Sequence, residues 1–341
     1  AVGGQKGMVI KMEDKFFCPD YYSRFSCIAS LCEDSCCRSG WEIPIDDETY
    51  LAYKSAGVSD IDENITTGSD GDRIFKLKPD GNCPYLEPDG LCRLYTITGG
   101  RLGEICAQYP RFFEEYDGFT EAGISISCPE AQRLILSAKR SDYALDTEQP
   151  QEELLAFLHS ARKFALDIAF SPNQPDVIAA RLIDYGIALQ ELIDTGELDF
   201  SDFAQLANAI IRTDDESNVS PTEEYIFACK AILEATDILY PQWKQLLIRG
   251  AGGEIAADTS MRDESERAYL GYLVYRFFLK AVNNENIAAV CEFIACAYYL
   301  AKMLPGEFAR NTRLFSKEIE HDSDNLWSVM ELFEERADSM L

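Results

Sequence analysis

The second part of the chain repeats its hydrophobic residues at helical spacing. Beyond about residue 149 they recur every three or four positions, which is the pattern of helices that bury one face. The pattern predicts helices over Glu152–Phe170, Pro175–Thr195, Phe200–Arg212, Pro221–Leu239, Arg262–Val282, Ile287–Leu304 and Asp324–Leu341. Ser220, with Pro221 next and Glu223 three residues on, is a typical helix start. We therefore expect residues 149–341 to form an irregular α-helical domain.

The first part, residues 1–148, has a different pattern. Its apolar runs are short and are interrupted by turn sequences such as Pro79-Asp80-Gly81 and Pro88-Asp89-Gly90. Arg111–Ser127 alternates partly around Asp117-Gly118, which predicts a β-hairpin. Segments of this kind bury little core alone, so a metal or disulfides must hold them together. The sequence thus predicts an α+β, mainly α fold, with a loop-rich N-terminal domain that contains a small β-hairpin, followed by the helical domain.

The chain of 341 residues is strongly acidic, with a net charge of −28. Residues 1–140 carry 15 Lys and Arg against 23 Asp and Glu, and residues 141–341 carry 16 against 36. This balance argues against nucleic-acid binding, which needs clustered basic residues. The acidic second part suits a basic partner surface or simply keeps the protein soluble, and both interpretations stay open.

Two absences in the sequence bear on location. No apolar run reaches the ~18 residues that a membrane-spanning helix needs. The longest run, near Ile287–Leu300, is interrupted by Glu292. The N-terminus has no apolar stretch of the kind found in secretory signals. We therefore expect a cytoplasmic protein that does not bind membranes and whose thiols stay reduced.

Cysteines are concentrated in the N-terminal domain, where nine of the twelve lie at or before residue 128. A disulfide framework and a metal site both explain clustered cysteines, and reduced thiols favour the metal. The predicted metal ligands are Cys27, Cys32, Cys36, Cys37, Cys83, Cys92, Cys106 and Cys128. Cys18 is a reserve ligand. Cys229, Cys291 and Cys296 fall on apolar helix faces and are expected in the core.

Sulfur is the only ligand type predicted for this site, because the two histidines, His159 and His321, lie outside the cysteine segment. All-sulfur sites hold zinc or an iron–sulfur cluster. Neither the Cys-x2-Cys pairs of zinc sites nor a ferredoxin spacing is present, so the residues alone leave the metal open. The side chains of adjacent Cys36 and Cys37 are expected to diverge. Two four-thiol sites, or one cluster with additional structural thiols, therefore fit equally well.

Several motif blocks of this segment resemble one known family. In chain order they are Phe25-Ser26-Cys27, Cys32–Ile43, Cys83-Pro84-Tyr85-Leu86, Gly90-Leu91-Cys92, Cys106–Arg111 and Ser127-Cys128-Pro129-Glu130. The blocks resemble the flagellin lysine-N-methylases (FliB-type) and, more loosely, proteins described as zinc- or iron-chelating cysteine-cluster proteins. In the helical part, Tyr269–Phe278 is similar to a segment of the same enzymes.

The resemblance implies an enzyme that transfers a methyl group from S-adenosylmethionine to surface lysines of flagellin or another protein. It also implies a 4Fe–4S cluster, with zinc as the alternative metal. The Cys-x3-Cys-x2-Cys motif of radical adenosylmethionine enzymes is absent, because Cys32-x3-Cys36 runs directly on to Cys37. Gly250-Ala251-Gly252-Gly253 follows a helical pattern, so we expect a turn there rather than a cofactor-binding loop.

Methyl transfer to lysine needs the neutral amine, and aromatic faces suit the cationic groups of donor and product. Three residues near the predicted ligands are candidate catalytic residues: Tyr109, Arg111, which would clamp a donor carboxylate, and Glu130, which would orient the amine. Trp41 and Tyr85 are the candidate contacts to the methyl donor. Each has a structural alternative, which is packing for the aromatic rings, a hairpin start for Arg111 and a first-turn helix acid for Glu130.

Two other hypotheses need no methyl transfer. In one, the zinc or iron–sulfur centre only stabilises the fold or senses redox state. In the other, the protein passes electrons to a partner. Incubation of metal-loaded protein with a labelled methyl donor and flagellin separates both from the first hypothesis.

Overall fold

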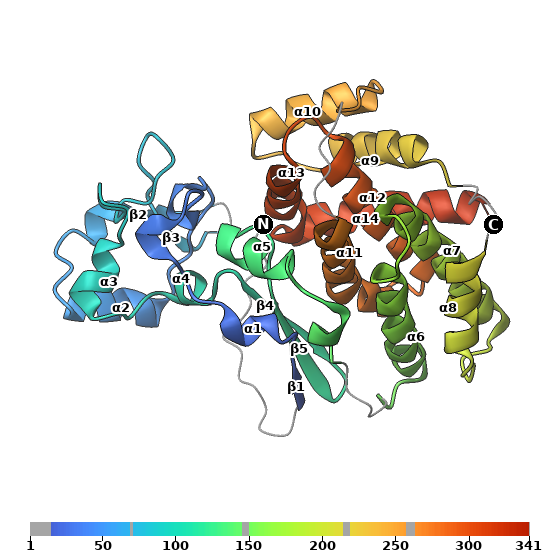
Figure 1. The fold of residues 1–341 in the computed structure, drawn as a ribbon. Coiled ribbons are helices and arrows are strands. Elements are labelled where there is room, and N and C mark those ends of the chain that lie inside the picture. Colours follow the sequence, from blue (N-terminus) through green and yellow to red (C-terminus); the bar gives the residue numbers. More distant parts are fainter. Residues whose placement is uncertain (1–14, 69–70, 145–149, 214–218, 257–262, 341) are drawn as a thin grey trace.

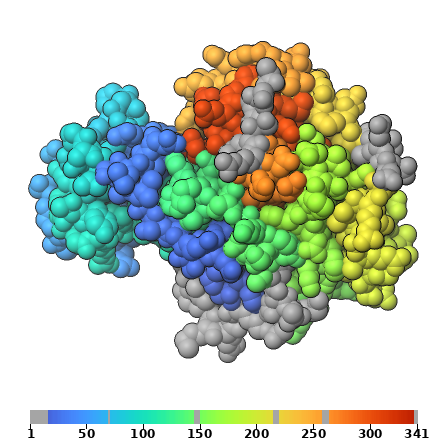
Figure 2. Space-filling model, viewed as in Figure 1, coloured from blue at the N-terminus to red at the C-terminus, as the bar shows by residue number. Residues whose placement is uncertain are grey.

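The computed structural model describes residues 15–68, 71–144, 150–213, 219–256 and 263–340. This part of the chain forms a large, mainly helical body from which a small lobe projects (Figure 1). Figure 2 shows the same lobe, coloured blue to cyan, standing out beside the body. Each has a hydrophobic core of its own, and the smaller core is built from residues between Ile43 and Leu94. The predicted α+β, mainly α fold is confirmed.

Most of the body is helical. Its helices are α6 (Glu153–Ala169), α7 (Pro175–Thr195), α8 (Phe203–Arg212), α9 (Pro221–Ala235), α10 (Pro241–Ala251), α11 (Asp263–Phe277), α12 (Ile287–Met303), α13 (Phe308–Phe315) and α14 (Ser323–Met340). A 3-10 turn, η5 (Phe278–Val282), follows α11, and a π-helical turn, η6 (Ser316–Glu320), follows α13. Each helix predicted in this part is present, with ends displaced by at most a few residues. The sequence did not predict α10 and α13. Helix α13 has only 8 residues and shows few turns of a periodic pattern, but α10, with 11 residues, is longer than the predicted α8.

Helix α12 is the centre of the body. Every residue from Ile287 to Ala301 is buried, and the helix packs against α7, α9, α11, α13 and α14. A Cβ atom added at Gly186 of α7 would lie 2.5 Å from the Cβ atom of Cys291, so glycine permits the close approach of these helices. The charge within this apolar run, Glu292, is paired with Arg336 of α14 at 2.8 Å. Among the described residues, no helix is long and apolar enough to cross a membrane.

A three-stranded sheet lies between the body and the small lobe. It contains β1 (Lys15–Phe17), β4 (Arg111–Tyr116) and β5 (Phe119–Ile124) in the order β1-β5-β4. Strand β1 runs parallel to β5, and β4 pairs antiparallel with β5 as the predicted hairpin. The hydroxyl of Tyr275 on α11 donates to the carbonyl oxygen of Ala122 at 3.0 Å, which ties the hairpin to the body.

The hairpin and α5 (Pro129–Ile135) contribute to the large core together with the helices. Both precede the domain boundary predicted between residues 148 and 149. That boundary stays a prediction. The N-terminal residues used to predict location lie mostly outside the described part of the chain.

The small lobe consists of short elements. They are α2 (Asp47–Ser55), α3 (Arg93–Thr98), α4 (Glu104–Gln108), β2 (Ile65–Thr67) and β3 (Arg73–Phe75), with the 3-10 turns η1 (Ala29–Leu31), η2 (Cys36–Arg38) and η3 (Asp62–Asn64). The helix α1 (Tyr21–Arg24) leads in from β1, and η4 (Arg140–Asp142) follows α5. Two predicted turns are present, with Gly81 and Gly90 at φ values of +80° and +83° that favour glycine. The lobe therefore has little regular structure to stabilise it.

A fully buried ion pair links the hairpin to the body. Arg162 of α6 donates to both carboxylate oxygens of Glu121 on β5, one of them at 2.7 Å. The side chain of Arg162 is 0% exposed and that of Glu121 is 4% exposed. The guanidinium also lies over the ring of Tyr275, at 5.5 Å from its centroid. Because neither charge reaches water, each depends on the other.

We predict that Arg162→Met destabilises the protein by about 3–5 kcal/mol, because it leaves the Glu121 carboxylate buried without a counter-charge. The double variant Arg162→Met/Glu121→Leu should recover most of this loss. Chemical denaturation followed by circular dichroism measures both effects. The exposed ion pair of Arg249 and Glu254 provides the control, because Arg249→Met should change little there. Equal losses of stability for Arg162→Met and Arg249→Met would contradict the prediction.

Candidate functional site

The eight predicted ligand cysteines lie in the small lobe and at its junction with the body. Four are in the loop that follows α1. Cys83 precedes the β-bridge between Leu86 and Cys92, and Cys92 is part of that bridge. Cys106 is in α4, and Cys128 is the N-terminal cap of α5. All twelve cysteines are free thiols. The three cysteines predicted to lie in the core are buried there, as expected: Cys229, Cys291 and Cys296.

Four cysteines affect one another's ionisation, and we call them the inner set: Cys37, Cys83, Cys92 and Cys106. Burial raises the pKa of Cys83 to about 12, and the charges of Cys37 and Cys92 add to the effect. Burial also raises the pKa of Cys106, with contributions from the other three thiols. The amide of Cys83 donates to the carbonyl oxygen of Cys37 at 2.8 Å, which holds these two residues side by side.

The other four cysteines form what we call the junction set: Cys27, Cys32, Cys36 and Cys128. Burial raises the pKa of Cys128, and the charges of Cys32 and Cys27 contribute. Burial raises the pKa of Cys32 too, again with a contribution from Cys27. The hydrogen bond with Cys37 and burial raise the pKa of Cys36, with contributions from Cys106 of the inner set and from Cys27. Since Cys128 belongs to the large core, this set lies where the lobe meets the body.

The adjacent residues Cys36 and Cys37 of η2 join the two sets. The hydrogen bond between their thiols raises the pKa of Cys36 and lowers the pKa of Cys37 to about 7. The amide of Cys37 donates to the hydroxyl of Ser35 at 3.3 Å, which fixes the start of the turn. Of the two sulfurs, Cys37 is therefore the one that more readily carries negative charge.

The donor chemistry of both sets fits a thiolate-bound metal, because four sulfurs are the ligand set of zinc cages and of iron–sulfur clusters. As arranged, no three His, Cys, Asp or Glu side chains in the described ranges converge closely enough to hold a metal ion. Metal binding would therefore require the thiols of a set to draw together. The identity of the metal and its ligands stays a prediction.

Three rings meet where the small lobe joins the body, and we call them the aromatic rim: Trp41, Tyr109 and His321. The ring centroids of Trp41 and Tyr109 are 5.2 Å apart. The His321 centroid lies 5.9 Å from that of Trp41 and 5.7 Å from that of Tyr109. Each of the three residues keeps part of its surface exposed. The structure thus brings two predicted site residues together and adds a histidine.

The rim contacts a group of buried polar residues that we call the polar floor: Ser125, Ser127, Tyr272, Ser316 and Glu320. His321 Nε2 lies 2.7 Å from the Ser127 hydroxyl and 3.1 Å from the Ser125 hydroxyl. The Tyr109 hydroxyl lies 3.0 Å from the Ser127 hydroxyl. Ser127 therefore connects two residues of the rim.

Glu320, at the end of η6, is the acid of the polar floor. The hydroxyl of Tyr272 donates to its Oε2 atom at 2.5 Å, and Ser125 donates to the same atom at 3.4 Å. Arg276 Nε lies 4.0 Å from that atom, and the Glu320 side chain is 1% exposed. Its other oxygen, Oε1, is buried and has no hydrogen-bond partner within the described part of the chain. A buried acceptor is thus left open.

The charges around this centre are largely neutralised. Burial, then Arg276 and Lys317, lowers the pKa of His321 to about 4, so the ring is neutral at neutral pH. Burial opposes ionisation of Glu114, but Arg276 and Lys280 lower its pKa to about 2. Lys280 contacts Glu114 at 3.0 Å, and Arg276 donates to the same oxygen. For Glu320, burial raises the pKa although Arg276 and Tyr272 counteract it.

Polar contacts hold the cysteine loop against the body beside this centre. Lys317 of η6 donates to both carboxylate oxygens of Asp34 at 2.8 Å. The side chain of Lys317 is 6% exposed and that of Asp34 is 34% exposed, so water screens this pair only in part. The hydroxyl of Tyr240 donates to the carbonyl oxygen of Ser39 at 2.8 Å. These contacts flank Cys36 and Cys37 and place Trp41 next to His321.

The other three predicted site residues have their described contacts elsewhere. Arg111 begins β4, and its guanidinium lies over the rings of Phe25 and Tyr22, at 5.2 and 5.7 Å from their centroids. Glu130 is in the first turn of α5 and pairs with Arg133 at 2.6 Å. Tyr85 is fully buried in the small core, where its ring lies 5.2 Å from that of Phe75. These contacts correspond to the structural alternatives, and the predicted roles stay predictions.

Sequence reasoning missed the residues that the body contributes. His321 was noted only for lying outside the cysteine segment, and Glu320 was not noted. The motif block Ser127–Glu130 pointed to the right region, and Tyr269–Phe278 contains Tyr272 and Arg276. The π-helical turn itself leaves no clear signal in the sequence, although such turns are frequent at functional sites.

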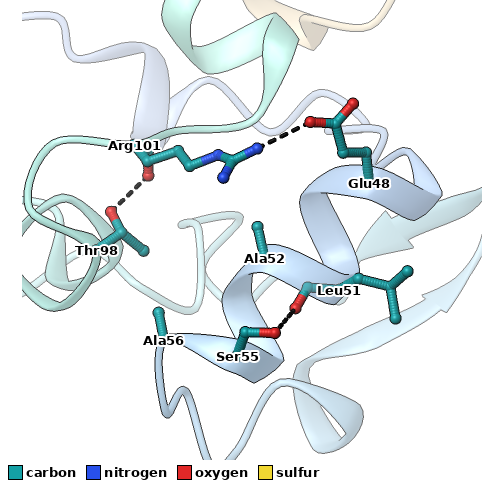
Figure 3. A pocket seen from close by; sticks show the side chains of 7 residues that line it. All are labelled: Glu48, Leu51, Ala52, Ser55, Ala56, Thr98 and Arg101. Atoms are coloured by element: carbon teal, nitrogen blue, oxygen red, sulfur yellow. Dashed lines mark hydrogen bonds and ion pairs between the residues drawn. The ribbon is translucent and has the colours of Figure 1, made fainter.

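The small lobe also has a surface hollow of about 410 Å³ between α2 and the segment Thr98–Arg101 (Figure 3). Arg101 donates to Glu48 across it at 2.8 Å. Neither the predicted site residues nor the two cysteine sets line this hollow. The rim and the polar floor are therefore the better candidate for chemistry.

Known proteins similar to this chain come from Salmonella. Over 128 residues it is 36% identical to the flagellar biosynthetic protein FliU of Salmonella muenchen, a match covering 75% of that protein and 35% of this chain. The lysine-N-methylases of Salmonella typhimurium and Salmonella choleraesuis are 36% and 35% identical over 128 residues. Those matches cover 35% of this chain but 32% of each enzyme, so the chain matches about a third of their length.

The chain belongs to the family of these FliB-type lysine-N-methylases and FliU, as the motif blocks indicated. No family model matches it. No solved structure matches it either.

We predict that His321 makes the stability of the protein depend on pH between about 6.5 and 4. An unfolded histidine has a pKa of about 6.5, whereas the folded value is about 4. As the pH falls through this range, the unfolded state binds more protons, so the folded state loses stability. In His321→Gln this loss should be smaller.

Denaturant midpoints of the wild type and His321→Gln at pH 7.5 and pH 5 measure this effect, and other acidic groups cancel in the comparison. His159→Gln is the control with the second histidine of the chain. If the denaturant midpoints of His321→Gln and wild type differ by the same amount at both pH values, the prediction is wrong.

Proposed function

We propose that the protein is a protein-lysine N-methyltransferase that uses S-adenosylmethionine, acts on surface lysines of flagellin, and carries a 4Fe–4S cluster on its cysteine segment. Zinc is the alternative metal. The carrying observation is the meeting of Trp41 and Tyr109 in one partly exposed aromatic centre beside the cysteine segment. Relatives of this chain that are named lysine-N-methylase support the reaction.

The chemistry of the proposed reaction suits this centre. A lysine amine attacks the methyl carbon of the sulfonium, so a nitrogen–carbon bond forms while the carbon–sulfur bond breaks and its electron pair stays on sulfur. The ammonium form has no lone pair, so the nitrogen must first give a proton to solvent water. A partly desolvated site favours the neutral amine. The aromatic faces of Trp41 and Tyr109 suit both the sulfonium and a methylated ammonium.

The proposed metal would be held by the two cysteine sets, and its contribution is to cross-link a lobe with a small core. Whether one centre or two forms depends on Cys36 and Cys37, which belong to different sets. The acidic charge of the helical part is compatible with a partner that presents lysines, because opposite charges attract at long range.

Anaerobically purified protein, incubated with labelled S-adenosylmethionine and flagellin, should transfer label to flagellin lysines. Flagellin with acetylated lysines should take up none. We predict that Tyr109→Phe lowers kcat/KM about tenfold or more, because the hydroxyl that contacts Ser127 is lost. Tyr95→Phe, which alters an exposed tyrosine of the small lobe, is the matched control.

No labelling of flagellin by the metal-loaded wild type would refute the substrate. No labelling of any lysine-containing protein would refute the methyltransferase and leave the metal-binding module as the function.

We also predict that metal removal unfolds the small lobe but not the body. After chelation, limited proteolysis should cut within residues 26–108, whereas the hairpin and helices resist, because they share the large core. The replacement Cys83→Ser should produce the same cleavage pattern and lower the metal content. Cys229→Ala, which changes a buried core cysteine, should leave the metal content unchanged. Equal cleavage of lobe and body would contradict this division.

A further inference from the structure

The most unusual feature of the junction is a buried carboxylate oxygen that accepts no hydrogen bond from the described residues. Glu320 keeps its Oε1 atom without a hydrogen-bond partner in the part of the chain that the structure describes, although its side chain is 1% exposed. An unpaired buried carboxylate oxygen is costly and needs an explanation. One explanation is that a ligand supplies the missing donor.

The surroundings of Glu320 restrict the charge of such a ligand. Oε2 already receives the hydroxyl of Tyr272, and Arg276 is 4.0 Å from that atom. Arg276 donates to Glu114 instead, and Lys317 is bound to Asp34. Both cations thus donate to other carboxylates. Arg276 Nε, 4.0 Å from Glu320 Oε2, and Glu320 Oε1 are both left without a hydrogen-bond partner among the described residues. A carboxylate with an open oxygen accepts a cationic donor best.

The aromatic rim further restricts the chemical class of the ligand that would donate to Glu320. Trp41, Tyr109 and His321 are partly exposed, whereas the residues of the polar floor that His321 and Tyr109 contact are buried. Aromatic faces attract ammonium groups and their methylated forms. His321 does not oppose such a cation, because its low pKa keeps the ring neutral. The Ser125 and Ser127 hydroxyls offer additional acceptors next to the ring.

We propose that the aromatic rim and the polar floor form the binding site for the lysine side chain, with the ammonium group of lysine or of its mono- and dimethylated forms donating to Glu320 and lying against Trp41 and Tyr109. This inference rests on the proposed function and names the residues that select its substrate. Glu320 and the rim bind the cation in the ground state. Glu320, His321 and the two serines come from segments that no sequence motif joined.

Calorimetric titration of the full-length, metal-loaded protein tests the site without any turnover. The probe is an acetylated and amidated Gly-Gly-Lys-Gly-Gly peptide, in unmethylated and dimethylated forms, both of which keep an N–H donor, with a norleucine peptide as the neutral isostere. We expect saturable binding of both lysine forms and no binding of norleucine. Glu320→Gln should weaken lysine binding at least tenfold.

The matched control is Glu266→Gln. Glu266 is also buried and also receives a tyrosine hydroxyl, from Tyr298 at 2.7 Å, but it is in α11 and has no contact with the rim among its described interactions. The Glu266→Gln variant should bind the peptide with the affinity of the wild type. Circular dichroism and thermal melting show whether each variant folds. If Glu320→Gln does not fold, Trp41→Leu on the partly exposed rim replaces it, with an expected loss of at least fivefold.

Equal affinity of Glu320→Gln and wild type, equal weakening by Glu266→Gln, or equal binding of the norleucine peptide would overturn the proposal. The outcome is separable from that of the proposed function. If the protein transfers methyl groups but Glu320→Gln binds the peptide as tightly as the wild type, only the proposed binding site is refuted. Glu320-dependent binding without methyl transfer refutes the enzyme activity but supports a lysine-binding site.

Discussion

The ion pair between Lys317 and Asp34 is the contact on which the arrangement of the candidate site depends. It joins the cysteine loop to the π-helical turn of the body, with both Asp34 oxygens 2.8 Å from the ammonium nitrogen. Because the Lys317 side chain is almost completely buried, its charge needs the partly exposed carboxylate of Asp34 as a partner. The same loop carries Trp41, and the same turn leads to His321. With the hydrogen bond from Tyr240 to Ser39, the ion pair holds the two rings 5.9 Å apart.

Local sequence patterns predicted much of the secondary structure. They could not predict contacts between residues that are far apart in the chain. The apolar periodicity located α7 and α12 closely, and the turn at Asp117-Gly118 located the hairpin. Tyr109 and Trp41 were found because each lies near a cysteine in the chain. Glu320 and His321 were not, because they reach the centre only after the helices have packed. A carboxylate in a helix and a lone histidine have many ordinary explanations, and only the packing distinguishes them.

The hairpin shows how the two hydrophobic cores are divided along the chain. The hairpin was predicted correctly, but its proximity to cysteines suggested that it belongs with the metal-binding loops. Its strand β5 is buried along its whole length, and Glu121 within it finds its counter-charge on α6. A buried carboxylate opposite a distant arginine is invisible in a local pattern. The hairpin is thereby part of the body and forms the fixed side of the junction.

The adjacent cysteines of η2 would affect how the two cysteine sets bind metal. Successive Cα atoms are about 3.8 Å apart, so Cys36 and Cys37 cannot be ordered separately. Any ligand that fixes one of them also restricts the other, and the second event then loses less conformational entropy. The two sets would therefore fill cooperatively. A lobe with so small a core would pass from empty to fully loaded with few half-filled molecules in between.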